Sequence, residues 1–363
     1  MKTDHKRNDH IDNQIEQSTG HQIEHKTEKI TLRRSFIAAC IIIVGLILLI
    51  IFMLISLTKG AAGIPISTVV ESFTQFDLES SKHLLVRDMR LPRVLGAVLV
   101  GAALSVAGAL MQGMTRNPMA DTGIMGLNSG AGLAIALCYA VFKDATYSQI
   151  VFASFMGAAL GASLVYIISN GVPGGNKPMK LVLAGATVSA LLSALSQGFA
   201  ISAGASQNVT FWTLGSMAGT NWNQIQFATP VITLALIGAI SISRGVSILS
   251  MGEEVALGLG VKTGAIKFLG TLFVVLLAGT SVAVAGTISF IGMMIPHFSR
   301  FIVGPDYRLI IPTSAVLGGL LLVVADLFSK TFAPPVELPV GAIIALIGVP
   351  VFLYFARKQK GEI

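Results

Sequence analysis

The sequence predicts an all-α polytopic membrane protein of about ten transmembrane helices, one of them half-length, arranged as an inverted repeat. The residues are 53% hydrophobic and only 12% charged, and the mean hydropathy is +0.77. A soluble domain normally carries about twice that fraction of charge. Long apolar segments alternate with short polar loops, and Lys and Arg gather in every second loop. This pattern is typical of a chain that crosses a membrane repeatedly.

The first 34 residues form a polar segment ahead of the membrane domain, which we predict over residues 35–363. This segment has too little apolar content to fold alone, so we expect a disordered cytoplasmic tail. His21 and His25 would share one face of a helix, and metal binding by the tail is the alternative. Ser35–Leu57 follows as the first membrane helix, since its apolar core is too long for a cleavable signal peptide.

Eight further apolar segments are long enough to cross a membrane, or nearly so. In chain order they are Pro92–Gln112, Ile124–Phe142, Ser148–Ser169, Met179–Ser202, Ile225–Ser243, Ile266–Ile288, Tyr307–Leu327 and Val340–Phe355. Phe290–Ile302 is too short to span and too polar at its end, so we predict a half-length helix there. Gly101–Gly108 resembles Gly279–Gly286 in a segment that enters from the opposite side, as an inverted repeat requires.

Loop charge predicts the orientation of the chain. One set of loops is rich in Lys and Arg and includes Arg33, Arg34, Lys262 and Lys267, whereas the opposite set is poor in them. The bias places both termini in the cytoplasm of a protein of the cell membrane. The net charge of +7 therefore reports topology, and it does not indicate a nucleic-acid partner.

One group of cations breaks this rule and falls on the outer side, ahead of the second membrane helix: Lys82, Arg87, Arg90 and Arg93. These cations could pair with Glu79, Asp88 or lipid phosphate. They could also dock an acidic patch on an external partner. The sequence leaves both interpretations open.

Several motifs of catalysis are missing from the sequence. There is no phosphate-binding loop of the Gly-x-x-x-x-Gly-Lys-Ser/Thr type and no zinc or hydrolase motif, so we predict no catalytic residue, cofactor or metal. Asp121 and Asp326 lie near helix ends, and we expect neither to have a partner in mid-membrane. A carrier driven by an ion gradient usually needs such groups. The chain therefore has the build of a transporter without its own energy source.

A short polar segment, Ser250–Lys267, lies between two long apolar segments. Its pattern predicts a small amphipathic helix made of Glu253, Glu254, Val255, Ala256, Leu257, Gly258, Leu259 and Gly260. The charge bias places it on the cytoplasmic surface, where its apolar side needs another protein to press against.

Three groups of motifs carry a family resemblance. They are Arg90–Arg93 with Gly108–Asp121, then Glu253–Val261, and finally Gly286–Arg300 with Glu337–Gly341. Together they resemble the FecCD permeases of ABC importers for iron–siderophore, haem and cobalamin, over roughly Ser35 to the C-terminus. The resemblance implies a homo- or heterodimer of permeases, a dimer of ATP-binding subunits in the cytoplasm, and an extracytoplasmic binding protein.

The resemblance also implies roles for individual residues. Arg90 and Arg93 would dock acidic residues of the binding protein, with Lys330 as a third, weaker contact because Lys cannot form a bidentate fork. The cytoplasmic gate would lie at Asn117, Pro118 and Met119, and the ATPase coupling helix at residues 253–260. From the residues alone, Ser193, Ser196 and Gln197 are candidates for a weakly polar pathway, with hydrogen bonding between helices as the alternative.

The expected function is ATP-driven import of an iron chelate, with a ferric siderophore as the first choice of cargo. Haem and cobalamin are the alternatives within the family. A secondary transporter driven by an ion gradient is the alternative from a different class.

Overall fold

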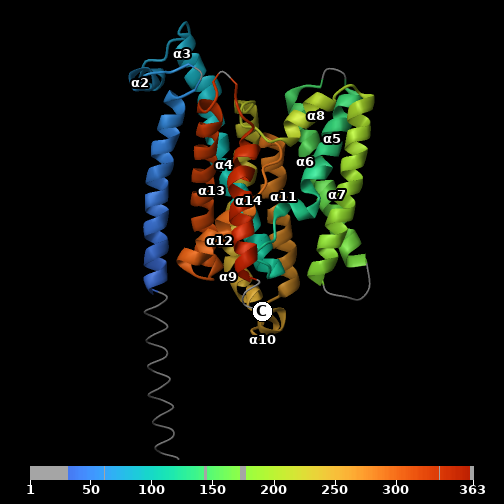
Figure 1. Ribbon diagram of the computed structural model, residues 1–363. Helices are drawn as coiled ribbons and strands as arrows, with labels where there is room; N and C mark the ends of the chain where they lie inside the picture. Colours follow the sequence, from blue (N-terminus) through green and yellow to red (C-terminus); the bar gives the residue numbers. More distant parts are fainter. Residues whose placement is uncertain (1–31, 61, 143–144, 172–176, 335, 360–363) are drawn as a thin grey trace, which may run out of the picture.

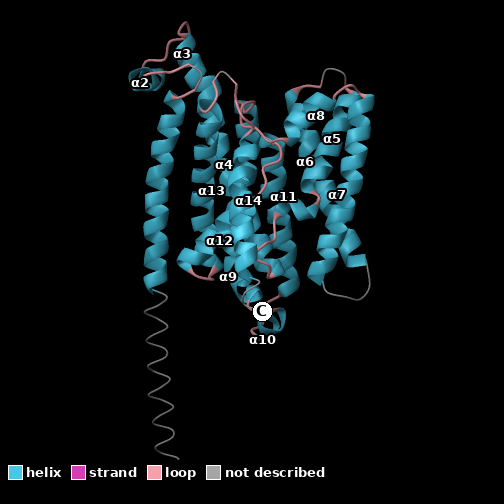
Figure 2. Cartoon of the chain, viewed as in Figure 1, coloured by secondary structure: helices cyan, strands magenta, loops and turns pink. Residues whose placement is uncertain are grey.

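The computed structural model describes residues 32–60, 62–142, 145–171, 177–334 and 336–359, and all regular structure in them is helical (Figures 1 and 2). The first helix of the described residues is Leu32–Thr58. The elements that follow are α2 (Ile66–Thr74), α3 (Ser81–Leu84), the π-helical η1 (Leu85–Arg90), α4 (Leu91–Thr115), the 3-10 helix η2 (Thr122–Met125), α5 (Leu127–Val141), α6 (Tyr147–Gly171), α7 (Lys177–Ser202), α8 (Ser206–Thr213), α9 (Trp222–Ser250), α10 (Glu253–Gly258), α11 (Thr263–Ala285), α12 (Ile291–Val303), α13 (Tyr307–Thr331) and α14 (Val340–Gln359).

The number of apolar helices agrees with the prediction. Within the described ranges, seven helices are long and apolar enough to cross a membrane, and three shorter apolar helices join them. The half-length helix is confirmed as α12. The predicted span Ile124–Phe142 is shorter than expected, because the 3-10 turn η2 and a left-handed Gly126 (φ 71°) occupy its first residues. The predicted tail, with His21 and His25, falls largely on residues 1–31 and so lies outside the described residues.

α4 is the central helix of the bundle, and α9, α11, α12 and α13 pack around it (Figure 1). Its close packing depends on two glycines. A Cβ atom on Gly101 would lie 2.3 Å from the carbonyl oxygen of Gly318 in α13, and one on Gly108 would lie 1.8 Å from that of Gly292 in α12. Small residues let helix backbones approach in this way, and dispersion contacts then hold the helices together in lipid.

A second group of helices, α5 to α8, stands beside the central bundle and contacts it mainly through α11 (Figure 1). The first helix lies at the opposite margin, and only 17% of its apolar window is buried. α4 and α11 run in opposite directions and pack against each other, which agrees with the expected inverted repeat. The repeat itself stays a prediction.

The bundle has two distinct ends. We name the end that carries α2, α3 and η1 the cap end, and the opposite end the α10 end (Figure 1). At the α10 end, Asp306 precedes α13 and accepts hydrogen bonds from Ser247 Oγ of α9 and from the Arg308 backbone N–H, each at 2.9 Å. Burial alone would raise the pKa of Asp306, but the hydrogen bonds from Arg308 and Ser247 outweigh it and lower that pKa below its usual range.

Candidate docking, coupling and pathway sites

The three cations predicted to dock a partner are buried and bonded within the chain. Arg90 and Arg93 are each 8% exposed, and Lys330 is 4% exposed. Arg90 lies at the end of η1, Arg93 in the first turn of α4 and Lys330 in the last turn of α13. All three therefore belong to the cap end, but none of them is presented to solvent.

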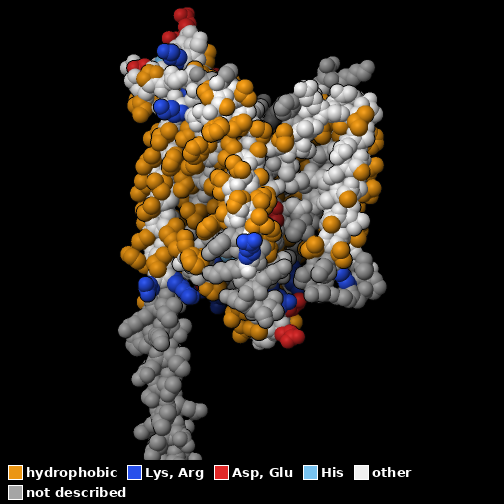
Figure 3. Space-filling model, in the orientation of Figure 1, with side chains coloured by type: hydrophobic (Ala, Val, Ile, Leu, Met, Phe, Trp, Pro, Cys, Tyr) orange, Lys and Arg blue, Asp and Glu red, His pale blue; other side chains and the backbone are white. Residues whose placement is uncertain are grey.

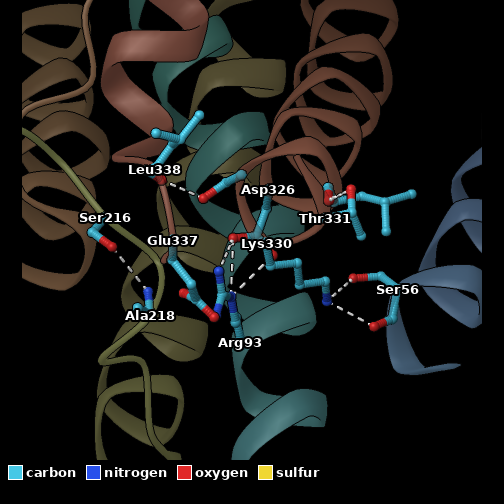
Figure 4. Close-up of polar contacts among 11 residues, drawn as sticks. Ser56, Arg93, Ser216, Ala218, Asp326, Lys330, Thr331, Glu337 and Leu338 are labelled. Atoms are coloured by element: carbon cyan, nitrogen blue, oxygen red, sulfur yellow. Dashed lines mark hydrogen bonds and ion pairs between the residues drawn. The ribbon is translucent and has the colours of Figure 1, made fainter. Parts of the chain in front are cut away.

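Arg93 binds two carboxylates of its own chain (Figure 4). Its Nη2 lies 2.9 Å from Oδ1 of Asp326, while Nε donates to both Asp326 oxygens at 3.0 and 3.1 Å. Its Nη1 donates to Glu337 Oε2 at 2.8 Å. The two carboxylates differ in exposure, since the Asp326 side chain is 1% exposed and the Glu337 side chain 37%.

This pairing corrects two expectations. Asp326 was expected to have no partner, yet it forms a bidentate pair with Arg93 from a helix 233 positions away in the chain. The partners of Arg93 are Asp326 and Glu337, and not the neighbouring Asp88 or Glu79. A planar guanidinium suits such two-carboxylate binding, because it can donate along several edges at once.

Arg90 and Lys330 both bind the end of the first helix. Lys330 Nζ donates to the backbone oxygen and to Oγ of Ser56, each at 2.7 Å (Figure 4). Arg90 Nη1 donates to the Leu57 carbonyl at 2.7 Å, and Nη2 donates to the Ala62 carbonyl. The last carbonyls of a helix have no partner within the helix and carry its partial negative charge. The two cations therefore cap the first helix and fasten it to η1 and α13.

The predicted coupling segment folds as a separate short helix at the α10 end (Figure 1). Glu253 and Glu254 begin α10, where acidic side chains suit the helix dipole, and Ala256 alone is buried. α10 ends at Gly258, two residues earlier than expected. Gly260, in the turn that follows, has a left-handed φ of 74°. The exposed apolar side chains of this segment are Met251 (71%), Val255 (46%), Leu257 (59%) and Leu259 (64%).

An ion pair holds α10 against the next spanning helix. Lys267 Nζ of α11 lies 2.6 Å from Glu253 Oε1, and both side chains are about one-third exposed, at 34% and 33%. The pair bounds a cavity of about 170 Å³ that Met111, Met114 and Arg116 from the end of α4 also line. α10 therefore packs on α9 and α11 and faces the end of the central helix across this cavity.

The predicted gate residues lie in the turn after α4. Arg116 ends the helix in a left-handed conformation (φ 53°), and Asn117 Oδ1 then accepts a hydrogen bond from the Met119 N–H at 2.9 Å. Pro118 and Met119 face Met293, Met294 and His297 of α12 across a cavity of only about 20 Å³. The turn is thus packed against the half-length helix, and its role as a gate stays a prediction.

The three pathway candidates lie on the wall of one groove between α5, α7 and α8. The groove has a volume of about 450 Å³, and Ser193, Ser196 and Gln197 line it from α7. The other polar side chains that line it are Asn128 and Ser129 of α5, Ser206, Thr210 and Thr213 of α8, and Thr287. Every polar lining side chain is a neutral hydroxyl or amide, so the groove offers hydrogen bonds without fixed charge.

The residues of α5 and α8 that line the same groove were not predicted from the sequence. Asn128 and Ser129 interrupt an apolar segment, and that polar pair was the available signal. Thr210 and Thr213 have no comparable signal, because only the fold of α8 places them opposite α7. Within the described residues, no group of three or more His, Cys, Asp or Glu is arranged to hold a metal ion.

Comparisons with known proteins identify the family. The model of the FecCD transport family matches residues 32–358. The iron(3+)-hydroxamate import system permease protein FhuB of Bacillus subtilis (strain 168) is 44% identical over 327 residues, which are 90% of this chain and 85% of FhuB. The ferric enterobactin transport system permease protein FepD of Escherichia coli (strain K12) is 36% identical over 316 residues, 86% of this chain and 94% of FepD.

A solved structure agrees with this assignment. A metal-chelate type ABC transporter in an inward-facing conformation superposes with a TM-score of 0.77 at 26% identity, and the match covers 88% of this chain and 99% of that one. The all-α fold and the half-length helix α12 are those expected from the family resemblance, and the family model matches nearly all described residues. The chain is a multi-pass membrane protein and belongs to the FecCD transport family.

Proposed function

We propose that this chain is the membrane-spanning permease subunit of an ATP-driven ABC importer that carries a ferric siderophore into the cytoplasm. The relatives FhuB and FepD are import permeases for iron(3+)-hydroxamate and ferric enterobactin. The observation that carries the proposal is the exposed apolar side of the segment around α10. Exposed apolar side chains on a helix outside the spanning region are typical of a protein interface.

The partner at α10 is a dimer of ATP-binding subunits on the cytoplasmic side. The α10 end carries several cations: Arg116 and Lys262 in its turns, Arg244 in the last turns of α9, Arg308 in the first turn of α13, and Arg33 and Arg34 at the start of the first helix. Such a bias indicates the cytoplasmic side, and both termini lie there in this proposal. Movement of α10 would reach the central helix through the Glu253–Lys267 pair and α11.

An extracytoplasmic binding protein would dock at the cap end. Of the three predicted docking residues, Arg93 is the one that a partner can reach most directly, since its partner Glu337 is exposed and could exchange with a carboxylate of the binding protein. Arg90 and Lys330 would contribute less, because contact with a partner would uncap the first helix.

The cargo would pass along the neutral groove between α5, α7 and α8, facing a second permease subunit, identical or related. Neutral hydroxyl and amide groups can pass a bulky polar chelate without binding it tightly. Residues 117–119 would close this path toward the cytoplasm. The membrane domain would begin with the first helix at Leu32, three residues earlier than predicted, and the residues ahead of it lie outside the described part of the chain.

Uptake by the complete importer in proteoliposomes tests the proposal. Ferric hydroxamate, ferric citrate, a ferric catecholate, haem and cobalamin are offered in turn, with the binding protein outside and ATP in the lumen. We expect uptake of a ferric siderophore that requires ATP and ignores an ionophore. Uptake of haem or cobalamin alone would show that the proposed cargo is wrong. Uptake by this chain without ATP-binding subunits, abolished by the ionophore, would favour a secondary transporter instead.

A further inference from the structure

α2 is an amphipathic helix at the margin of the cap end, and neither the docking nor the transport proposal uses it. It spans Ile66–Thr74 between the first helix and α3. Val69 is 5% exposed and packs with Leu57, Ile64 and Val86 in a small apolar cluster, so the helix is firmly attached to the cap. Three large apolar side chains nevertheless point away from the protein.

The side chains of α2 divide into three sectors around the helix axis, given roughly 100° per residue. One sector contacts the protein and holds Thr68, Val69 and Ser72. The second is exposed and apolar, and holds Ile66 (69% exposed), Val70 (55%) and Phe73 (52%). The third is exposed and polar, and holds Ser67, Glu71 and Thr74.

Each sector covers about one-third of the circumference, so the helix meets three different surroundings. A helix on the surface of a soluble domain has two sides, one against the core and one against water. A helix at the edge of a membrane protein, lying along the lipid surface, has protein on one side, lipid beneath and water above. The order of the sectors around α2 corresponds to this second arrangement.

The position of α2 agrees with the sector pattern. It lies beyond the end of the first helix at the margin of the bundle, and it is not aligned with the spanning helices (Figure 1). The first helix exposes Ile51 (44%), Leu54 (52%) and Ile55 (37%) along its last turns. Hydrophobic side chains continue along this margin and reappear on α2 (Figure 3). The apolar sector thus extends the lipid-facing surface of the first helix.

We propose that α2 lies in the interface of the adjacent membrane leaflet, with Ile66, Val70 and Phe73 inserted among the lipids. The helix then anchors the cap to the bilayer, and through Val69 and Val86 it fixes the height of η1 and its cations. A docking face for a protein partner is the rival interpretation of the same side chains. That partner would cover the apolar sector only when it is bound.

Nitroxide labels at single cysteines test the proposal in the full-length chain. The background carries Cys40→Ala and Cys138→Ala, and the chain is placed in nanodiscs of phosphatidylcholine and phosphatidylglycerol. Val70→Cys and Phe73→Cys probe the apolar sector, and Ser67→Cys and Thr74→Cys are matched controls one sector away. Leu54→Cys provides the lipid reference. A high rate of collisions between a label and oxygen indicates a lipid environment, and a high rate of collisions with a water-soluble nickel chelate indicates an aqueous one.

We expect the ratio of oxygen to nickel collisions at positions 70 and 73 to approach the value at position 54, and to exceed the value at positions 67 and 74 several-fold. Equal ratios in the two sectors would overturn the proposal. Nickel accessibility at positions 70 and 73 that disappears only when the binding protein is added would also overturn it, in favour of protein docking. All four label positions on α2 are exposed, so the labels should not disturb the fold.

Discussion

The two predicted partner surfaces of this protein differ in how their key residues are held. At the α10 end, Leu257 and Leu259 are 59% and 64% exposed and pack against nothing in the described part of the chain that would hold them in place. At the cap end, Arg90, Arg93 and Lys330 are buried, and their polar atoms already bind carbonyls and carboxylates of the same chain. A surface made of exposed apolar groups is ready to bind, whereas a surface made of buried cations must first give up internal contacts.

The difference has an energetic basis. Exposed apolar side chains gain free energy when a partner removes them from water, roughly 1.5–3 kcal/mol for a fully buried Leu. A buried cation gains little from a new carboxylate, because it exchanges one partner for another of the same kind. Its internal partners are costly to remove, since an uncompensated buried charge is strongly unfavourable. We therefore assign the cap-end cluster chiefly to stability and the α10 surface chiefly to binding.

The largest expected effect on stability distinguishes Asp326 from Glu337, the two carboxylates that bind Arg93. Asp326→Asn keeps the shape of the side chain but removes a buried charge, and we expect it to lower the free energy of unfolding by about 3 kcal/mol. The control Glu337→Gln changes an exposed side chain, and its cost should stay below about 1 kcal/mol. Denaturant unfolding of the purified chain in detergent measures both variants.

The same two variants can contradict the assignment of the cap-end cluster to stability. If Asp326→Asn unfolds like the wild type while affinity for the binding protein falls, the cluster is a docking surface and not a structural one. If Glu337→Gln strengthens binding at unchanged stability, Glu337 competes with the partner for Arg93, as the exchange in the proposed docking requires.

The second effect concerns the α10 surface. Replacing Leu257 and Leu259 with Ser should weaken binding of the ATP-binding subunits at least tenfold, or about 1.4 kcal/mol. Unfolding of the permease alone should not change, because both side chains are exposed. Lys262→Ala, an exposed change three residues further on, is the control and should leave binding intact. Affinity is measured by titrating labelled ATP-binding subunits onto the permease in nanodiscs.

A loss of stability in the double Ser variant would show that these side chains pack within the permease. An unchanged affinity would place the ATPase interface elsewhere. Either result removes the contrast between the two ends of the molecule.

The two regions also differ in how far the sequence could predict them. α10 was predicted nearly to its ends, because acidic residues, an apolar side and terminal glycines are local signals. The half-length α12 was predicted from its short length and its polar end, which are local signals as well. The partners of Arg93 could not be found in this way, since Asp326 and Glu337 lie more than 200 positions away and only tertiary packing brings them together. Likewise Ser193, Ser196 and Gln197 share a helix face by spacing, whereas their neighbour Thr210 depends on how α8 folds back.

The smallest expected effect tests whether the α10 ion pair transmits movement. Lys267→Met removes a partly exposed pair with Glu253, so the loss of stability should be below about 1 kcal/mol and should shrink further in high salt. The pair nevertheless joins α10 to α11, and we expect fewer cargo molecules imported per ATP hydrolysed. Arg308→Met is the matched control, because it removes a comparable pair with Asp306 at the same end but away from α10. The ratio of uptake to hydrolysis in proteoliposomes distinguishes them: a fall in Lys267→Met alone supports transmission through the pair, and an equal ratio in both variants assigns the coupling to the apolar side chains of α10 only.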